Sequence, residues 1–274
     1  MKSLVVLLGV FAFSLNGCDV IDSPFTKSEK VDTTTTPTTR KILIDEFTGC
    51  NCRFCPGGHE ELSRLKTMYG DRIIAVSLHA GSFAVPVPPE YTADFRSEFA
   101  ESLYNDFAVS GEPSAVINRT KFDGTYALGK SAWADAIVTE SIKSAEISLD
   151  ANCTWNKNSN MVEVTINSKY LTEIATPTNI VLYVVEDSII APQNKLGTVI
   201  PNYIHRDIVR SMPLGRYGTT LTNMLISKGN IVTKSYSFQV EKSWNVEHIK
   251  IIAAIIENDG EQKRVIQCQE ISLK

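Results

Sequence analysis

The most constraining feature of this chain is a cluster of three cysteines where an apolar run meets a helix-like segment. Cys50, Cys52 and Cys55 fall within six residues, directly after the apolar run of residues 42–47. A Cys-x-x-Cys pair at a strand-to-helix junction favours redox chemistry, because the positive end of a helix stabilises a thiolate. The same residue types also tie loops together or hold a metal, so the surrounding sequence has to decide between these uses.

The N-terminal residues predict the compartment. Lys2 is followed by an uncharged apolar stretch over residues 4–15, which is too short to span a bilayer and is typical of a signal peptide. The stretch ends in Leu-Asn-Gly-Cys, which resembles a bacterial lipoprotein processing box. We therefore predict a signal peptide over residues 1–17, lipidation of Cys18 and membrane attachment through that lipid alone. An ordinary cleaved signal peptide is the alternative.

Beyond Cys18 the chain divides by composition. Residues 18–40 are polar and contain a Thr- and Pro-rich tract, so they are predicted to form a flexible tether. The remainder is long enough for two domains, which we place at residues 41–144 and 145–274. The formal net charge of −4 and the lack of a basic cluster give no support for nucleic-acid binding.

Residues 41–144 are predicted to alternate strands and helices. Apolar runs indicate buried strands at residues 42–47, 73–78 and 115–117, and helical spacing indicates helices at residues 59–69, 92–107 and 131–144. Pro56 suits the first turn of the first helix, where a missing N–H costs nothing. The pattern predicts an α/β domain.

This order of elements resembles the thioredoxin fold. Phe47 precedes Cys52 by five residues, where thioredoxins carry a strand phenylalanine, and Glu46 lies where they bury a carboxylate. Pro113, within Gly-x-Pro-Ser, resembles the proline that is cis in thioredoxins and faces the disulfide. The resemblance implies a thioredoxin-like domain over residues 41–144.

The sequence also resembles a Bacteroidetes lipoprotein family named for a twenty-eight-kilodalton outer-membrane protein. The resemblance rests on residues 46–49, Cys52, Cys55, Pro56, His59, residues 78–81 and residues 203–206. The family implies a thioredoxin-like domain followed by a β-rich domain, an outer-membrane location and, for some members, adhesion. Cys50 departs from the family pattern.

The resemblance to thioredoxins assigns roles to individual residues. Cys52 is expected to be an exposed nucleophile at the helix N-terminus, with the positive charge of Arg53 lowering its pKa. Cys55 is expected to resolve mixed disulfides, and Glu46 to act as the buried base that accepts its proton. Pro113 is expected to lie beside the sulfur atoms and to help hold a substrate segment.

Other interpretations of the cysteine cluster stay open. One is that Cys52–Cys55 is an inert structural disulfide, because a fold does not fix its function. Another is a zinc site formed by Cys50, Cys52, Cys55 and His59, although an oxidising compartment favours disulfides. We therefore expect neither metal nor cofactor, and we expect His59 to cap or pack beside the helix. Isolated histidines such as His79 and His205 line a cleft or, more commonly, pack in loops.

The other cysteines raise the question of a second disulfide. Cys153 and Cys268 lie near the start and end of the second domain, so a bond between them is a candidate structural disulfide. Cys50 is then left over, and it either competes for a neighbouring sulfur, captures a partner or has no role.

Residues 145–274 are predicted to be all-β. Residues 161–166 alternate in polarity, and further strands are expected at residues 180–185, 231–240, 249–256 and 264–271. About seven strands suggest an immunoglobulin-like sandwich. The connection over residues 192–222 is rich in aromatic and basic side chains, which indicates either a ligand surface or a solvated loop.

The sequence thus predicts an exported, lipid-anchored protein of the cell envelope, placed at the outer membrane. Two functions follow from it. The first is thiol–disulfide exchange with exported protein thiols and disulfides through Cys52 and Cys55. The alternative is a surface adhesin or binding lipoprotein, in which the same pair is only structural.

Overall fold

The computed structural model describes residues 39–260 and 263–273, which belong to one compact unit covering residues 38–274. The predicted signal peptide, the lipidation site Cys18 and all but the last two residues of the predicted tether lie outside the described residues. The expected boundary at residues 144–145 falls in the connection between a helix that ends at Ser141 and a strand that begins at Ile147.

Strands dominate the described part of the chain. The α-helices are α1 (Cys55–Tyr69), α2 (Glu98–Asp106) and α3 (Trp133–Ser141), with short 3-10 helices at Gly70–Arg72, Ser82–Ala84, Lys130–Ala132 and Val246–His248. The strands are β1 (Ile42–Thr48), β2 (Ile73–His79), β3 (Ser114–Ile117), β4 (Leu128–Gly129), β5 (Ile147–Asn156), β6 (Met161–Tyr170), β7 (Thr178–Glu186), β8 (Ile189–Lys195), β9 (Thr198–His205), β10 (Ile208–Ser211), β11 (Thr219–Thr222), β12 (Ile231–Gln239), β13 (Ile249–Glu257) and β14 (Val265–Ser272).

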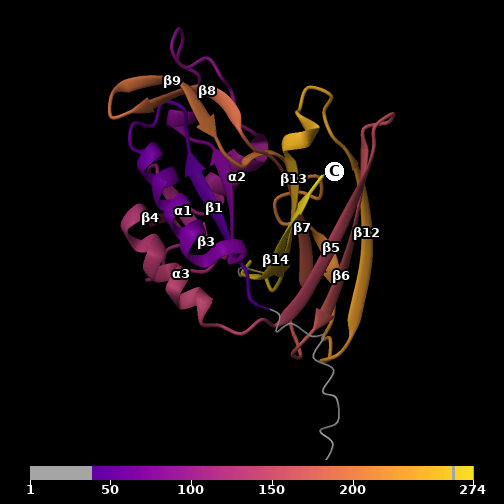
Figure 1. Cartoon of the computed structure of the whole chain (residues 1–274). Helices are drawn as coiled ribbons and strands as arrows, with labels where there is room; N and C mark the ends of the chain where they lie inside the picture. The colour runs from indigo at the N-terminus through magenta and orange to yellow at the C-terminus, as the bar shows by residue number, and fades with distance from the viewer. Residues whose placement is uncertain (1–38, 261–262, 274) are drawn as a thin grey trace, which may run out of the picture. The chain divides into compact units, whose positions relative to one another are not determined.

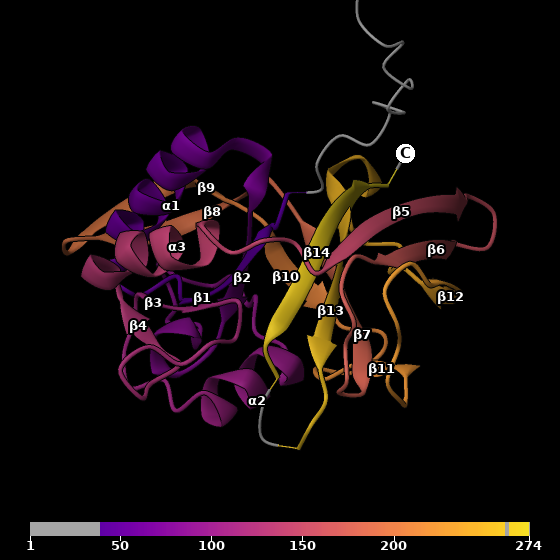
Figure 2. The same ribbon diagram turned by 90° about the horizontal axis from the view of Figure 1, so that it is seen from below.

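Nine strands form one mixed sheet that runs through both halves of the chain (Figure 2). Its order is β14-β13-β7-β10-β2-β1-β3-β4, with β11 attached to β7. The pairs β1–β2 and β10–β2 are parallel, and the remaining pairs are antiparallel. A smaller antiparallel sheet has the order β12-β6-β5, and β8 and β9 form a separate hairpin.

Alternating side chains give the large sheet two buried faces. On one face, Leu43 and Phe47 of β1 join apolar residues of α2, β7, β13 and β14 in a single core. The opposite face is covered by two different layers. Helices α1 and α3 pack there over Ile42 and Ile44 of β1, while the small β12-β6-β5 sheet packs over β7 and β13.

The predicted fold class, an α/β thioredoxin-like domain followed by a separate immunoglobulin-like sandwich, is wrong. Strand β10 pairs with β2, and the Ser77 main-chain N–H donates to the Asp207 carbonyl at 2.8 Å. Strands from residues 145–274 therefore extend the sheet begun by β1 and β2, and the structure is predominantly β, with mixed and antiparallel sheets. The prediction failed because local apolar patterns identify strands but do not show which distant strands pair.

Individual elements were predicted better than their arrangement. The strands expected at residues 42–47 and 73–78 are β1 and β2, and the expected helix at residues 131–144 contains α3. Helix α2 begins later than predicted, at Glu98, because Ser97 caps it by accepting a hydrogen bond from the Ala100 N–H at 3.1 Å.

The hairpin of β8 and β9 was not predicted, because residues 192–222 were interpreted as a long connection. Lys195 pairs with Thr198 across a two-residue turn formed by Leu196 and Gly197, both with positive φ. This is the turn geometry that suits the twist of a tight hairpin. The hairpin crosses over the end of β1 that leads into α1 (Figure 1).

Candidate functional site

The disulfide lies in the loop that joins β1 to α1. Cys52 and Cys55 are bonded to each other, with their Cα atoms 5.4 Å apart. Cys55 is the first residue of α1 and Pro56 lies in its first turn, as the sequence predicts. Cys52 is 1% exposed and Cys55 is 0% exposed. The expectation of an exposed nucleophile at Cys52 is therefore wrong, because both cysteines are shielded from solvent.

The tip of the β8–β9 hairpin covers the cysteine loop, which we define as residues 49–54. The main-chain N–H of Asn194 donates to the Cys50 carbonyl at 2.9 Å, and that of Leu196 donates to the Arg53 carbonyl at 3.0 Å. Between them, the buried Gln193 side chain donates from Nε2 to the carbonyl of Cys52 at 3.0 Å. The hairpin is thus joined to the loop by main-chain and side-chain hydrogen bonds.

The other side of the cysteine loop is held by the segment after β2. The Asn51 N–H donates to the Phe83 carbonyl at 3.0 Å. Gly49 permits this approach, because a Cβ at that position would lie 2.4 Å from the main chain of Phe83. The loop is therefore clamped between two segments, which accounts for the burial of the disulfide.

A buried polar chain runs from β1 to the hairpin. The Glu46 carboxyl accepts a hydrogen bond from Ser77 Oγ at 3.1 Å, and its other oxygen lies 3.5 Å from His59 Nε2. His59 is joined to Thr48 Oγ1 at 3.1 Å through Nε2 and to the Tyr203 hydroxyl at 2.6 Å through Nδ1. His59 therefore links the strand to the hairpin, rather than only capping α1.

Burial sets the protonation of this polar chain. Desolvation raises the pKa of Glu46 to about 8, against the weaker lowering effect of the Ser77 hydrogen bond. Desolvation also lowers the pKa of His59 to about 4. Between these values the carboxyl is protonated and the imidazole is neutral. The Glu46–His59 contact is therefore a contact of neutral groups and not an ion pair.

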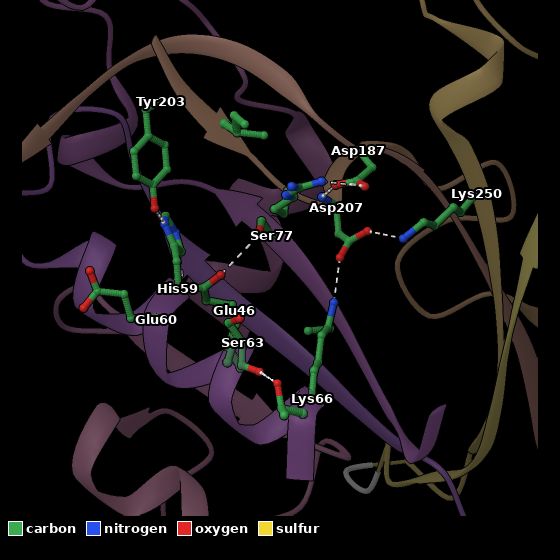
Figure 3. A pocket seen from close by; sticks show the side chains of 15 residues that line it. Glu46, His59, Glu60, Ser63, Lys66, Ser77, Asp187, Tyr203, Asp207 and Lys250 are labelled. Atoms are coloured by element: carbon green, nitrogen blue, oxygen red, sulfur yellow. Dashed lines mark hydrogen bonds and ion pairs between the residues drawn. The ribbon is translucent and has the colours of Figure 1, made fainter. Parts of the chain in front are cut away.

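A cavity of about 660 Å³ opens beside the polar side chains of Glu46, His59 and Tyr203 (Figure 3). Its lining residues are Glu46, His59, Glu60, Leu62, Ser63, Lys66, Thr67, Ala75, Ser77, Asp187, Tyr203, Ile204, Arg206, Asp207 and Lys250. Helix α1 supplies one wall and β9 another. The β8–β9 hairpin therefore lines the cavity and also covers the disulfide.

One wall of the cavity carries a buried charge cluster. The Asp207 carboxylate accepts hydrogen bonds from Lys66 Nζ at 2.7 Å and from Lys250 Nζ at 2.8 Å. Although burial opposes ionisation, the two ammonium groups hold the pKa of Asp207 below its usual value. Sequence reasoning missed all three residues, because they lie far apart in the chain and belong to no recognisable motif.

Two other predicted site residues remain, of which Arg53 belongs to the cysteine loop and Pro113 lies beside α1. The Glu112–Pro113 peptide is cis, as expected, and Pro113 lies close to Gly58 of α1, where an added Cβ would be 2.9 Å from the Pro113 Cβ. Arg53 is exposed, and its guanidinium lies over the Phe54 ring at 5.1 Å. Both residues line a second cavity beside the hairpin tip.

The predicted disulfide between Cys153 and Cys268 is not formed. Both residues are free thiols, as is Cys50. Cys268 belongs to the core on the α2 face of the large sheet, whereas Cys153 packs against the core on the opposite face. The sheet lies between them, and Cys153 Sγ donates instead to the Ser272 carbonyl at 3.5 Å.

Comparison with known families places the protein in the cell envelope. Residues 100–274 match a family of outer membrane proteins. The family is described as outer membrane protein Omp28, and this chain belongs to it. The predicted family and the predicted outer-membrane location are confirmed, but the thioredoxin-like part of that prediction is not supported. Within the described residues, no helix has the length and apolar character needed to cross a membrane.

Two solved structures are similar in fold, and a third aligns with part of the chain. HBP35 of Porphyromonas gingivalis aligns over 86% of this chain and 76% of its own, with a TM-score of 0.65 and 17% identity. A protein of Agrobacterium tumefaciens aligns over 85% of this chain and 94% of its own, with a TM-score of 0.52 and 13% identity. A domain of the outer membrane lipoprotein Omp28 from Porphyromonas gingivalis covers 47% of this chain and 89% of its own, with a TM-score of 0.34 and 16% identity. No match is found among curated proteins.

Proposed function

We propose that this protein is a binding lipoprotein of the outer membrane, in which Cys52–Cys55 is a structural disulfide. The observation that carries the proposal is the cover over the disulfide. The two cysteines are 1% and 0% exposed beneath a hairpin that is hydrogen-bonded to the loop carrying them. Thiol–disulfide exchange requires a thiolate to approach a sulfur atom along an open path. The cover therefore favours a binding role over catalysis.

Two exposed apolar side chains lie at the cysteine loop and at the tip of the hairpin that covers it. Phe54 of the cysteine loop is 56% exposed, and Leu196 at the hairpin tip is 62% exposed. The two residues line one cavity together with Lys130 and Lys195. Exposed apolar side chains with a charged rim are typical of protein-binding surfaces. We call Phe54 and Leu196 the apolar pair and propose that it contacts another exported or surface protein.

Thiol–disulfide exchange on exported proteins is the competing function. It requires the β8–β9 hairpin to leave the cysteine loop before Cys52 reacts. It also requires Glu46 to serve the sulfur atoms as a base. In the described residues the Glu46 carboxyl is instead engaged by Ser77 and lies beside His59. These contacts support the binding function better than exchange.

A pull-down from envelope and surface protein extracts tests the binding function. The wild-type protein and the Cys52→Ser/Cys55→Ser variant are expected to retain the same partner, because the disulfide only stabilises the loop. Adding charge to the apolar pair by Phe54→Asp/Leu196→Asp is expected to weaken capture by about tenfold or more. Ile142→Asp is the matched control, since Ile142 is also apolar and is 80% exposed at the end of α3. Capture that requires Cys52 and survives only as a mixed disulfide would instead establish exchange.

A further inference from the structure

Three potential metal ligands from separate segments meet in the interior beneath the hairpin. Cys50 lies in the cysteine loop, His79 ends β2 and His205 ends β9. The Cys50 Sγ atom and one ring nitrogen of each histidine all lie within 4.8 Å of one another. The three residues are buried, with exposed fractions of 3%, 2% and 1%. The fold therefore gathers one sulfur and two nitrogen donors at one buried point.

The ring nitrogens of this cluster lack the partners that buried polar atoms normally have. None of the four nitrogens of His79 and His205 makes a hydrogen bond within the described residues. The carbonyls of Ala191 and Pro192 lie near enough to the His205 ring to raise its pKa, but not in hydrogen-bonding geometry. A buried polar atom without a partner destabilises the folded protein, so four in one place call for a ligand.

Aromatic side chains surround the cluster. The Phe95 ring meets the His79 ring edge-on at 5.1 Å and the His205 ring at 5.2 Å, and Tyr203 packs against His205 at 5.1 Å. The two imidazole rings are themselves 5.6 Å apart. Such surroundings exclude bulk water and hold the rings in place. Asp94 is an acidic group near the cluster: its negative charge adds to the burial that raises the pKa of Cys50, and it only partly offsets the burial that lowers the pKa of His79.

We propose that Cys50, His79 and His205 form a binding site for a thiophilic d10 metal ion, Cu(I) or Zn(II). Thiolate sulfur and neutral imidazole nitrogen are the donors that both ions prefer. Metal–ligand bonds of about 2.0–2.3 Å place donors roughly 3.3–3.9 Å apart. The present donors all lie within 4.8 Å of one another, so metal binding brings them closer by no more than about 1.5 Å.

The protonation states suit this assignment. Burial lowers the pKa of His205 to about 4 and that of His79 well below its usual value, so both rings are neutral and have a lone pair to donate. Burial raises the pKa of Cys50 to about 12, so without a metal its sulfur is a thiol. On binding, the S–H bond breaks, a metal–sulfur bond forms and one proton passes to solvent. No oxidant or reductant is needed.

A bound ion would also join the hairpin to the large sheet. Cys50 belongs to the cysteine loop, His79 to the sheet and His205 to the hairpin that covers the disulfide. One ion shared by these segments holds the cover closed. The site also gives Cys50 a role. It differs from the zinc site expected from the sequence, whose ligands included Cys52 and Cys55, because these two cysteines are bonded to each other.

Metal binding is tested on the full chain under anaerobic conditions, with Cys50 shown to be reduced by alkylation and mass spectrometry. Zn(II) and Cu(I) are added separately in competition with a coloured chelator, and the bound metal is counted by elemental analysis. We expect one ion per chain, and X-ray absorption that reports one sulfur and two nitrogen ligands. The arm that binds more tightly identifies the ion. Cys50→Ser is expected to weaken binding by about a hundredfold or more.

Matched variants separate a ligand role from a loss of folding. Cys268→Ser removes another buried thiol, on β14, and is expected to leave metal affinity unchanged. His205→Gln is expected to weaken binding while its circular dichroism stays that of the wild type. The proposal is overturned if the reduced protein binds no ion above background. An internal water that satisfies the ring nitrogens in place of a metal would give that result. Binding that is unchanged in both Cys50→Ser and His205→Gln, as at a surface site, would overturn it too. Neither result bears on the proposed partner binding.

Discussion

Replacing Arg119 with methionine is expected to lower the free energy of unfolding by about 3–5 kcal/mol, because it leaves a buried charge uncompensated. The Arg119 and Asp45 side chains are both 0% exposed, and Arg119 Nε lies 3.3 Å from Asp45 Oδ2. Arg119 also donates to the Tyr183 hydroxyl at 2.6 Å, and that hydroxyl donates to Asp45 Oδ1 at 2.8 Å. Urea unfolding followed by circular dichroism measures the loss.

Two variants control this prediction. Arg64→Gln removes an exposed ion pair with Glu61 on α1 and is expected to leave the free energy of unfolding almost unchanged, because solvent screens exposed charges. Adding Asp45→Asn to Arg119→Met removes the uncompensated carboxylate and is expected to recover part of the loss. If Arg119→Met unfolds within about 1 kcal/mol of the wild type, the buried contacts of Arg119 with Asp45 and Tyr183 do not stabilise the fold in the way that this prediction requires.

Replacing Glu46 with glutamine is expected to stabilise the protein at pH 8 and to leave it unchanged at pH 4.5. The carboxyl has a pKa of about 8 in the folded protein and an ordinary value of 4.5. Its protonated form therefore contributes stability that is complete below pH 4.5 and is lost as the pH rises to 8. Each pH unit in this window contributes about 1.4 kcal/mol, so the gain at pH 8 is a few kcal/mol.

Urea unfolding of the wild type and Glu46→Gln across pH 4–9 measures this difference. Glu60→Gln is the matched control, because Glu60 lies at the same cavity but is exposed and paired with Lys195. In Glu60→Gln, the free energy of unfolding is expected to change between pH 4.5 and pH 8 by about as much as in the wild type. Parallel stability profiles for the wild type and Glu46→Gln would show that Glu46 is ionised in the folded protein.

His59 is expected to make stability fall at acid pH, whereas Glu46 makes it fall at alkaline pH. Its pKa of about 4 lies below its ordinary value of 6.5, so the stability contributed by the neutral ring is present above pH 6.5. That contribution is lost as the pH falls towards 4. The two buried groups therefore limit stability on opposite sides of neutrality.

The sequence predicted the local elements around the disulfide and little of what surrounds them. The strand-to-helix junction at the disulfide, the proline in the first turn of α1 and the apolar strand β1 follow from short-range patterns, although α1 begins at Cys55 and not at Cys52 as expected. No local sequence pattern predicts the pairing of β10 with β2, because the paired residues Ile208 and Ser77 are far apart in the chain. The large sheet therefore continues across the boundary expected at residues 144–145.

The most consequential error concerned the connection over residues 192–222. The aromatic and basic side chains of this segment indicated a ligand surface or a solvated loop, and Gly197 is the one turn-type residue in the Leu196–Gly197 turn that signals a hairpin. That hairpin carries Tyr203 to the cavity and His205 to the cluster with Cys50. It also changes an expected reactive disulfide into a covered one. No spacing in the sequence relates His79 to His205, so their meeting depends on the fold.

The rate at which dithiothreitol reduces Cys52–Cys55 tests the covered disulfide most directly. Alkylation at timed intervals and mass spectrometry of the cysteine-loop peptide measure the rate in native protein and in urea. We expect reduction of the native protein to be about a hundredfold slower or more, because it must wait for local opening of the hairpin. We also expect no catalysis of insulin reduction. Equal rates in the native and unfolded protein, together with insulin reduction above background, would contradict a structural disulfide and establish exchange.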